Sequence, residues 1–294
     1  MATLNKQVWV NQILEGFYPD SSFLKYVKDL SSLVDNDVIN IAEAGVDPKV
    51  IINNITYPIP VGLRVDKPIA FELDKFETEN TVVIRPEVIE YSYDQLESVI
   101  RGHRASLRTK TAAKAAHAYA PVKDGLYTPV IKTTGSAHGN RKRLQFSDII
   151  ELKSRFDITD TPLENRYLVL SPQHVTDLLL EDVKLFKDLT NVKDGTPFNF
   201  AGFSLLQTSL TPKYKLKTNG IYEKLGFEDK AATPDNFCSF AFQADEVMKA
   251  DGEMYMYVQI DDPKLRGTIV GFDKRFIAFP LRERGVGSIV SDNA

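Results

Sequence analysis

The clearest pattern of apolar and polar positions predicts one long helix over residues 93–119. Apolar side chains recur there at intervals of three and four, as one face of a helix requires: Leu96, Val99, Ile100, His103 and Leu107. Alanines crowd the second half of this stretch and favour helix. Ser92 and Gln95 form a capping-box pattern at its start, and Pro121 ends it. At 1.5 Å per residue the helix would be about 40 Å long, so we expect it to serve as a spine.

The chain before this helix divides into two parts. Residues 1–50 alternate short apolar pieces with glycine and proline, and they hold the only tryptophan, Trp9. A segment so interrupted cannot build a core alone, yet it is too apolar for a disordered tail. We expect an arm that packs on its own subunit or on a neighbour. Deleting residues 1–35 should then leave a folded body that assembles poorly.

Residues 55–84 have the pattern of extended chain. Their apolar positions alternate as in a half-buried strand: Ile69, Phe71 and Leu73 against Ala70, Glu72 and Asp74. A polar turn at 77–80 separates this run from the β-rich segment 81–84. Pro58, Pro60 and Pro68 exclude a central position in a sheet. The pattern predicts a protruding hairpin with exposed edges, which favours assembly over a monomeric state.

A compact mixture of helices and strands follows the long helix. A polar loop, 122–145, leads to a short helix from Phe146, a buried strand at 167–170 and a helix from Pro172 to about Lys187. Strand-like runs then recur at 198–208, 237–242, 254–260, 267–271 and 275–281. A loop at 209–235 separates two of them, and loops of that length are usually functional. The predicted fold class is α+β.

Composition narrows the class of protein. The 294 residues can form one large or two modest domains. A net charge of -4 argues against a dedicated nucleic-acid binder, although a local basic patch stays open. The one cysteine, Cys238, excludes an internal disulfide, and its apolar neighbours predict a buried thiol. No apolar run is long enough to span a membrane, and we expect folding in a cytoplasm.

Motifs that carry chemistry are missing from the sequence. Gly285–Gly287 has no third glycine for a dinucleotide site. The four histidines, His103, His117, His138 and His174, lack the spacing of metal ligands. The residues of Gly135–Gly139 stand in the wrong order for a nucleophile elbow, and we expect this segment to be the tip of a loop. We therefore predict no catalytic, cofactor or metal site.

One charge pattern stands out on the long helix. From Ser98 to Lys123 the chain has no acidic residue. Arg101, Arg104 and Arg108 share one flank beside the apolar stripe. This flank is either solvated, paired with acidic groups of a neighbour, or turned toward packaged nucleic acid. The last reading requires a protein that lines a container.

The order arm, extended hairpin, spine helix, α/β domain and returning strands resembles the major capsid fold of tailed bacteriophages, which encapsulins share. Local stretches are also similar to capsid proteins of phages that infect Bacteroidetes-type hosts: Glu43–Pro48, Asn53–Asn54, Thr78–Thr81 and Arg275–Arg282. The resemblance assigns the chain to an arm (1–50), an extended loop (51–85), a peripheral region with the spine (86–145), an axial domain (146–250) and returning strands (251–294).

The resemblance also implies a function. Subunits would form hexamers and pentamers of an icosahedral shell around double-stranded DNA, in a virion assembled in the host cytoplasm. Scaffolding, portal and decoration proteins would be partners, and any scaffold would be a separate protein because this chain has no room for one. The protein would not be an enzyme. Two alternatives stay open: an encapsulin-like nanocompartment shell, and a metabolic α/β enzyme with an atypical site.

Overall fold

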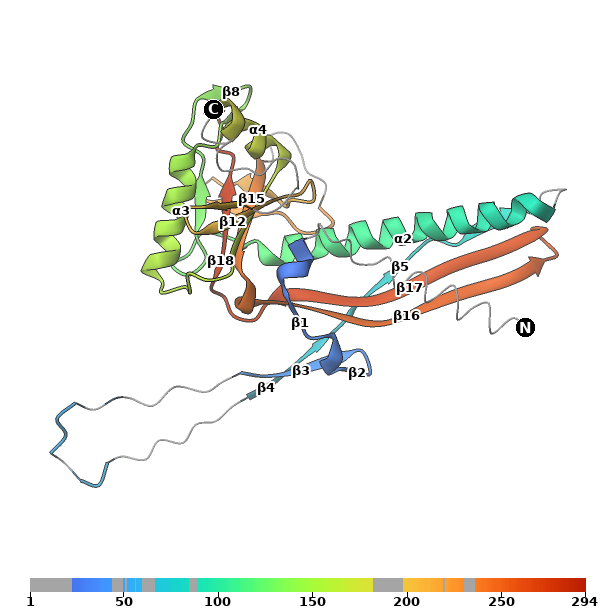
Figure 1. Cartoon of the computed structure of the whole chain (residues 1–294), viewed down its shortest axis with the longest axis horizontal. Helices are drawn as coiled ribbons and strands as arrows, with labels where there is room; N and C mark the ends of the chain where they lie inside the picture. The colour runs from blue at the N-terminus through green and yellow to red at the C-terminus, as the bar shows by residue number, and fades with distance from the viewer. Residues whose placement is uncertain are drawn as a thin grey trace.

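The computed structural model describes residues 23–43, 50, 52–55, 57–59, 67–84, 89–181, 198–218, 220–229 and 236–294. A sheet-rich body lies at one end of a long helix, a long hairpin runs beside that helix, and a narrow loop extends away from both (Figure 1). The described helices are α2 (Ile89–Tyr119), α3 (Phe146–Ile158) and α4 (Pro172–Glu181), with short 3-10 turns η1 (Phe23–Tyr26), η2 (Ser31–Leu33) and η3 (Ala244–Glu246). The α+β class is confirmed.

The body is built on an eight-stranded sheet. Its strands are β7 (Val130–Lys132), β10 (Arg166–Leu170), β11 (Phe198–Phe200), β12 (Phe203–Gln207), β13 (Lys213–Leu216), β14 (Tyr222–Lys224), β15 (Asn236–Gln243) and β18 (Val286–Val290). Buried side chains of α3, including Leu152 and Phe156, pack against β10, β12 and β18. A Cβ at Gly287 of β18 would lie 2.8 Å from the ring of Phe156, so glycine there lets the helix approach the sheet closely.

The long hairpin pairs β16 (Val247–Asp262) with β17 (Gly267–Pro280) and runs along α2. The parallel strand β1 (Lys28–Asp29) joins its β16 edge, and β5 (Asp74–Glu77) and β6 (Thr81–Ile84) pair with β17. Ile100 and Leu107 of α2 are buried against Met256 and Phe272. The apolar stripe predicted for the long helix is therefore its packing face.

The end of α2 is as predicted, but its start is not. The helix begins at Ile89, so Ser92 lies inside it and is not its N-cap. A capping box marks only one permitted start.

A bulge divides β16 into two halves. Gly252 and Glu253 together lie opposite Arg275, between the pairs Asp251–Phe276 and Met254–Lys274. One extra residue reverses the alternation of a strand. Before the bulge, the odd-numbered Val247 packs in the same cluster as the end of α2, while the even-numbered Met248 faces the base of the extended loop. Beyond the bulge, the even-numbered Met256 faces α2.

The extended loop arises from a three-stranded sheet of β2 (Val34–Asp35), β3 (Val38–Glu43) and β4 (Lys67–Glu72). Asn36 and Asp37 join β2 to β3 with φ of 48° and 62°, as a tight primed hairpin turn requires. β3 pairs with β4 over six residues. The expected protruding hairpin is present, but its first strand is β3, which lies before residue 55, because alternation identifies a strand but not its partner.

Several segments predicted as loops contain short strands. The segment 122–145 includes β7, β8 (Ala137–His138) and β9 (Arg141–Lys142), and 209–235 includes β13 and β14. Strands of two to four residues with lysines and arginines carry too little apolar periodicity to be recognised. The runs 267–271 and 275–281 form the single strand β17, and the predicted end of the helix at Lys187 lies outside the described residues.

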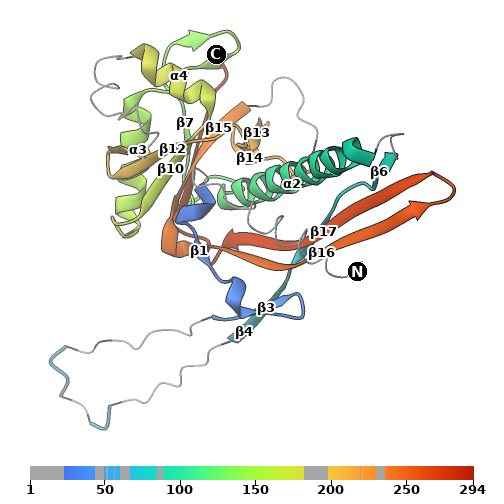
Figure 2. The same ribbon diagram turned by 45° about the vertical axis from the view of Figure 1, so that its right-hand side comes forward.

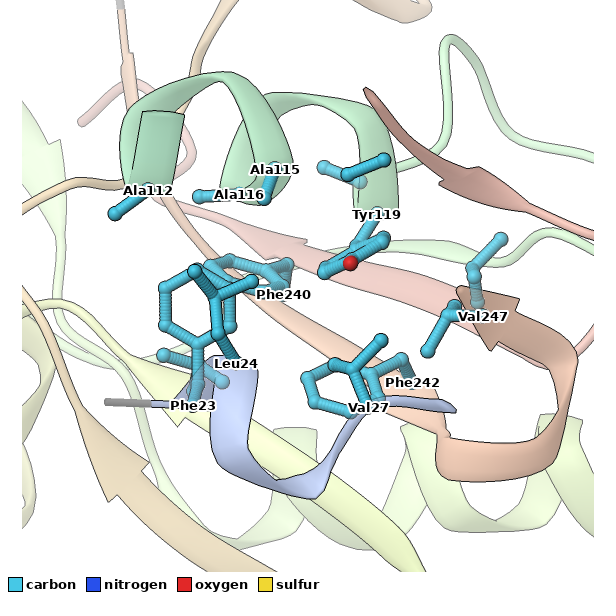
Figure 3. Packing of buried hydrophobic residues seen from close by; sticks show 14 of the residues in the cluster. Phe23, Leu24, Val27, Ala112, Ala115, Ala116, Tyr119, Phe240, Phe242 and Val247 are labelled. Carbon is cyan, nitrogen blue, oxygen red and sulfur yellow. The ribbon is translucent and has the colours of Figure 1, made fainter. Parts of the chain in front are cut away.

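The described arm residues belong to the subunit's own core. Phe23, Leu24 and Val27 of the η1 segment are buried against Tyr119 of α2 and Phe240 of β15. Figure 3 shows this contact, with the arm on one side of the aromatic rings and the helix on the other. The ring centroid of Phe23 lies 5.5 Å from that of Phe240 and 6.2 Å from that of Tyr119, and both pairs of rings meet edge to face. The arm thus joins the body to the spine.

Candidate assembly surfaces

The extended loop carries apolar side chains that have no core of their own. It projects from the body in both views (Figures 1 and 2). Between 52% and 93% of each described apolar side chain near its end is exposed: Val50, Ile52, Ile55, Tyr57 and Ile59. An apolar surface of this kind marks a contact with another molecule.

The long hairpin offers a second surface. On the described chain, the outer edge of β16 pairs only with β1, at Met248 and Lys249. Beyond the bulge, Tyr255 and Tyr257 are about half exposed, and the hydroxyl of Tyr257 donates a hydrogen bond to Asp273 at 3.1 Å. A long open strand edge beside exposed aromatic rings suits strand-to-strand contact between subunits.

The basic flank of α2 lies beside its packing face. Arg101 and Arg108 are exposed and Arg104 is half-buried, while Ile100 and Leu107 point into the subunit. Within the described part of the chain, neither Arg101 nor Arg108 forms an ion pair. The three arginines lie along one flank of α2, and the ligand of that flank stays a prediction.

An open groove of about 930 Å³ runs along the other side of α2. Gly102, His103 and Ser106 line it from the helix, and Phe76 and Glu79 line it from the β5–β6 segment. His103 is buried beside Phe272, with ring centroids 5.2 Å apart, and burial lowers its pKa. Polar and apolar side chains both line the groove.

The most enclosed polar cluster joins α4 to the sheet. His174 is completely buried; its Nδ1 lies 2.6 Å from the Ser239 hydroxyl and its Nε2 lies 2.8 Å from the Ser291 hydroxyl. The two terminal guanidinium nitrogens of Arg141 donate to the carboxylate of Asp177, which lies one turn further along α4. Although serine and histidine meet here, the cluster is closed to a substrate and acts as a structural link to the C-terminal segment.

This cluster predicts a pH dependence of stability. Burial lowers the pKa of His174 to about 4 from 6.5, opposed by the charge of Asp177 and aided by that of Arg141. Between these two values the unfolded chain binds a proton that the folded chain does not, so stability rises with pH there and is lost as the pH falls. The slope should reach about 1.4 kcal/mol per pH unit.

Urea unfolding at pH 4.5 to 7 measures this slope. His174→Asn keeps a hydrogen-bonding side chain but does not titrate, and it should flatten the profile. His138→Asn, at an exposed position, is the matched control and should leave the slope unchanged. An equal slope in wild type and His174→Asn would contradict the assignment.

The other candidate residues for catalysis or metal binding form no site in the described part of the chain. Cys238 is fully buried as predicted, and burial raises the pKa of its thiol. Gly135–Gly139 runs into the small β8–β9 hairpin. The described residues contain no cluster of three or more metal-ligating side chains, and none of the described helices is long and apolar enough to cross a membrane.

Comparison with known proteins gives a likeness in structure alone. No protein-family model matches the chain, and no curated protein matches it in sequence. The capsid of Ralstonia phage GP4 matches with a TM-score of 0.62 and 9% identity, over 96% of this chain and 91% of that one. The capsid of cyanophage P-SCSP1u matches with a TM-score of 0.59 and 14% identity, over 94% and 90%.

A virus-like particle from Pyrococcus furiosus matches with a TM-score of 0.56 and 11% identity, over 97% of this chain and 99% of that one. Nearly the whole chain is aligned in all three cases, so the likeness extends over the body, the long helix and the extended loop together. The chain therefore has the major capsid fold of tailed bacteriophages.

Proposed function

We propose that this chain is the major capsid protein of a tailed bacteriophage. It assembles as hexamers and pentamers into an icosahedral shell around double-stranded DNA, and it is not an enzyme. The observation that carries the proposal is the alignment of nearly the whole chain with phage capsid subunits. The exposed apolar loop and the open edge of β16 support it, because both call for contact with further copies.

The division of the chain follows from this proposal. The eight-stranded body is the axial domain, and α2 with the β16–β17 hairpin forms the peripheral domain. We propose that the extended loop includes β3 in addition to residues 51–85, because β3 pairs with β4. We also propose virion localisation after assembly in the host cytoplasm, with scaffolding, portal and decoration proteins as partners. An origin in a phage of Bacteroidetes-type hosts stays a prediction.

Electron microscopy of the purified chain, alone and co-expressed with its scaffolding protein, tests the proposal. Closed shells or ring-shaped capsomers are expected, and light scattering should give masses of many subunits. Monodisperse monomers under both conditions would refute it.

The alternative is an encapsulin-like shell that holds a protein cargo. The likeness to the Pyrococcus furiosus particle favours it over an enzyme. DNA content separates the two shells: particles from infected cells should contain genomic DNA if the chain is a phage capsid protein, and a folded cargo protein without a genome if it is not.

The basic flank of α2 predicts an electrostatic contact with the packaged DNA. Arg101→Glu with Arg108→Glu should leave shell assembly and melting unchanged, because both side chains are exposed. Capsomers of this variant should bind duplex DNA more weakly, and the slope of log K against log salt should fall by about 0.9 per lost phosphate contact.

Lys264→Glu with Arg266→Glu makes the same charge change at the exposed tip of the long hairpin and serves as the control. It should bind DNA as the wild type does. If both variants lose affinity equally, net charge and not the flank governs the contact. Failure of the arginine variant to assemble would instead assign the flank to a neighbouring subunit.

A further inference from the structure

A single residue separates the last strand of the loop sheet from the first strand of the peripheral sheet. β4, the last strand of the loop sheet, ends at Glu72, and β5 of the peripheral sheet begins at Asp74. Leu73 between them is buried with Ile39 of the loop sheet and Met248 of the long hairpin. In Figure 2, β4 lies on the side of the hairpin away from α2. The direction of the loop therefore depends on how Leu73 is held.

Leu73 is held against a glycine. Gly252 is the first of the two bulge residues of β16. A Cβ at this position would lie 2.8 Å from Cδ2 of Leu73 and 2.6 Å from Cβ of Arg275. Carbon atoms in contact are ordinarily about 3.5–4.0 Å apart. Only a residue without a side chain admits Leu73 at this depth.

Polar contacts fix the other strand of the loop sheet at the same place. The Nε of Arg275 lies 3.2 Å from a carboxylate oxygen of Asp37, and the backbone N–H of Leu73 donates to the carbonyl of Asp37 at 2.9 Å. Asp37 is the turn residue that opens β3. The contact thus gathers β16, β17 and both sides of the loop base.

We propose that Leu73 seated against Gly252 is the joint that sets the direction of the extended loop, and that this pair positions the loop for contact with a second copy. The bulge has two consequences here. It reverses the alternation of β16, and it brings a glycine to the place where Leu73 crosses the hairpin. The second half of the proposal rests on the proposed function; the first half does not.

The test measures the loop direction in unassembled subunits. Spin labels at Asn40→Cys on β3 and Ser154→Cys on α3 occupy exposed positions, and the buried Cys238 is protected from labelling. Pulsed electron paramagnetic resonance then gives the distance between loop and body. In this labelled background, Gly252→Ala should shift the distance distribution, because the joint must open by about 1 Å to restore ordinary contact.

Gly102→Ala is the matched control, because nothing lies within 4 Å of a Cβ built there; it should leave the distribution unchanged. Leu73→Ala removes the seated side chain without a clash and should broaden the distribution, so it tests the joint even if Gly252→Ala fails to fold. Wild-type distributions in both Leu73→Ala and folded Gly252→Ala would overturn the proposal.

Shell formation by the same variants separates the two claims. Gly252→Ala should reduce the yield of regular shells at least tenfold while Gly102→Ala does not. Regular shells at full yield from a variant with a displaced loop would overturn the positioning role. A displaced loop in a protein whose wild type never forms shells would support the joint and refute the capsid function.

Discussion

Replacing Ile52 and Ile55 with aspartate is expected to abolish shell formation and leave the subunit folded. Both side chains lie near the end of the extended loop, 81% and 93% exposed, so the subunit loses no core contact. In a shell each would be buried against a neighbour, where an apolar side chain contributes about 1.5–3 kcal/mol. A buried carboxylate would cost more than the lost contact, and every subunit would carry this cost.

Electron microscopy and sedimentation measure the loss of shells, and thermal melting checks the subunit. The variant should melt within about 1 °C of the wild type, as surface changes usually do. Ile52→Val with Ile55→Val keeps the apolar surface and should still assemble. Wild-type yields of shells from the aspartate variant would show that the end of the loop contacts solvent and not a neighbour.

The sequence predicted elements whose signal is local. The periodicity of Ile100, His103 and Leu107 identified the packing face of α2, because a helix of this length is specified by its own residues. The alternation of Phe71 and Leu73 likewise identified extended chain. The basic flank could be placed as soon as the helix was known, since positions 101, 104 and 108 share a face by geometry alone.

The strand partners could not be predicted in the same way. β3 and β4 pair across a long insertion, and β5 and β6 pair with β17 near the other end of the chain. A strand's alternation shows which face is buried but not which edge is paired. The bulge at Gly252 was also missed. The apolar residues of β16 stand at even positions on both sides of it, Met248 and Ala250 before and Met254 and Met256 after, so the sequence does not show that the buried face changes.

For the arm, the sequence left two kinds of contact open. Its apolar residues were expected to pack on the subunit or on a neighbour, and deletion of 1–35 was expected to leave a folded body. The structure buries Phe23, Leu24 and Val27 in the subunit's own core. Asp29 in addition lies 3.3 Å from the ammonium of Lys249, whose side chain is only 6% exposed. Composition could not distinguish a contact within the subunit from a contact with a neighbouring subunit, since both bury the same side chains.

Phe23→Ala is therefore expected to destabilise the subunit by about 3–5 kcal/mol, as large aromatic truncations in cores do. The ring of Phe23 touches Phe240 of the body and Tyr119 of the spine, so its loss opens a cavity between two parts of the fold that the arm holds together. Deleting residues 1–35 should cost more, because Leu24, Val27 and the Asp29 carboxylate are lost with it. That variant should be unfolded, not merely unable to assemble.

Urea unfolding of the unassembled subunit measures these effects. Lys28→Ala changes an exposed side chain of the adjoining strand β1 and should unfold at the wild-type urea concentration. Deleting only residues 1–22 retains the described arm side chains of this core, so it separates the contribution of Phe23–Asp29 from that of the chain before it. A folded 1–35 deletion with the wild-type midpoint would mean that the arm packs on the core without stabilising it.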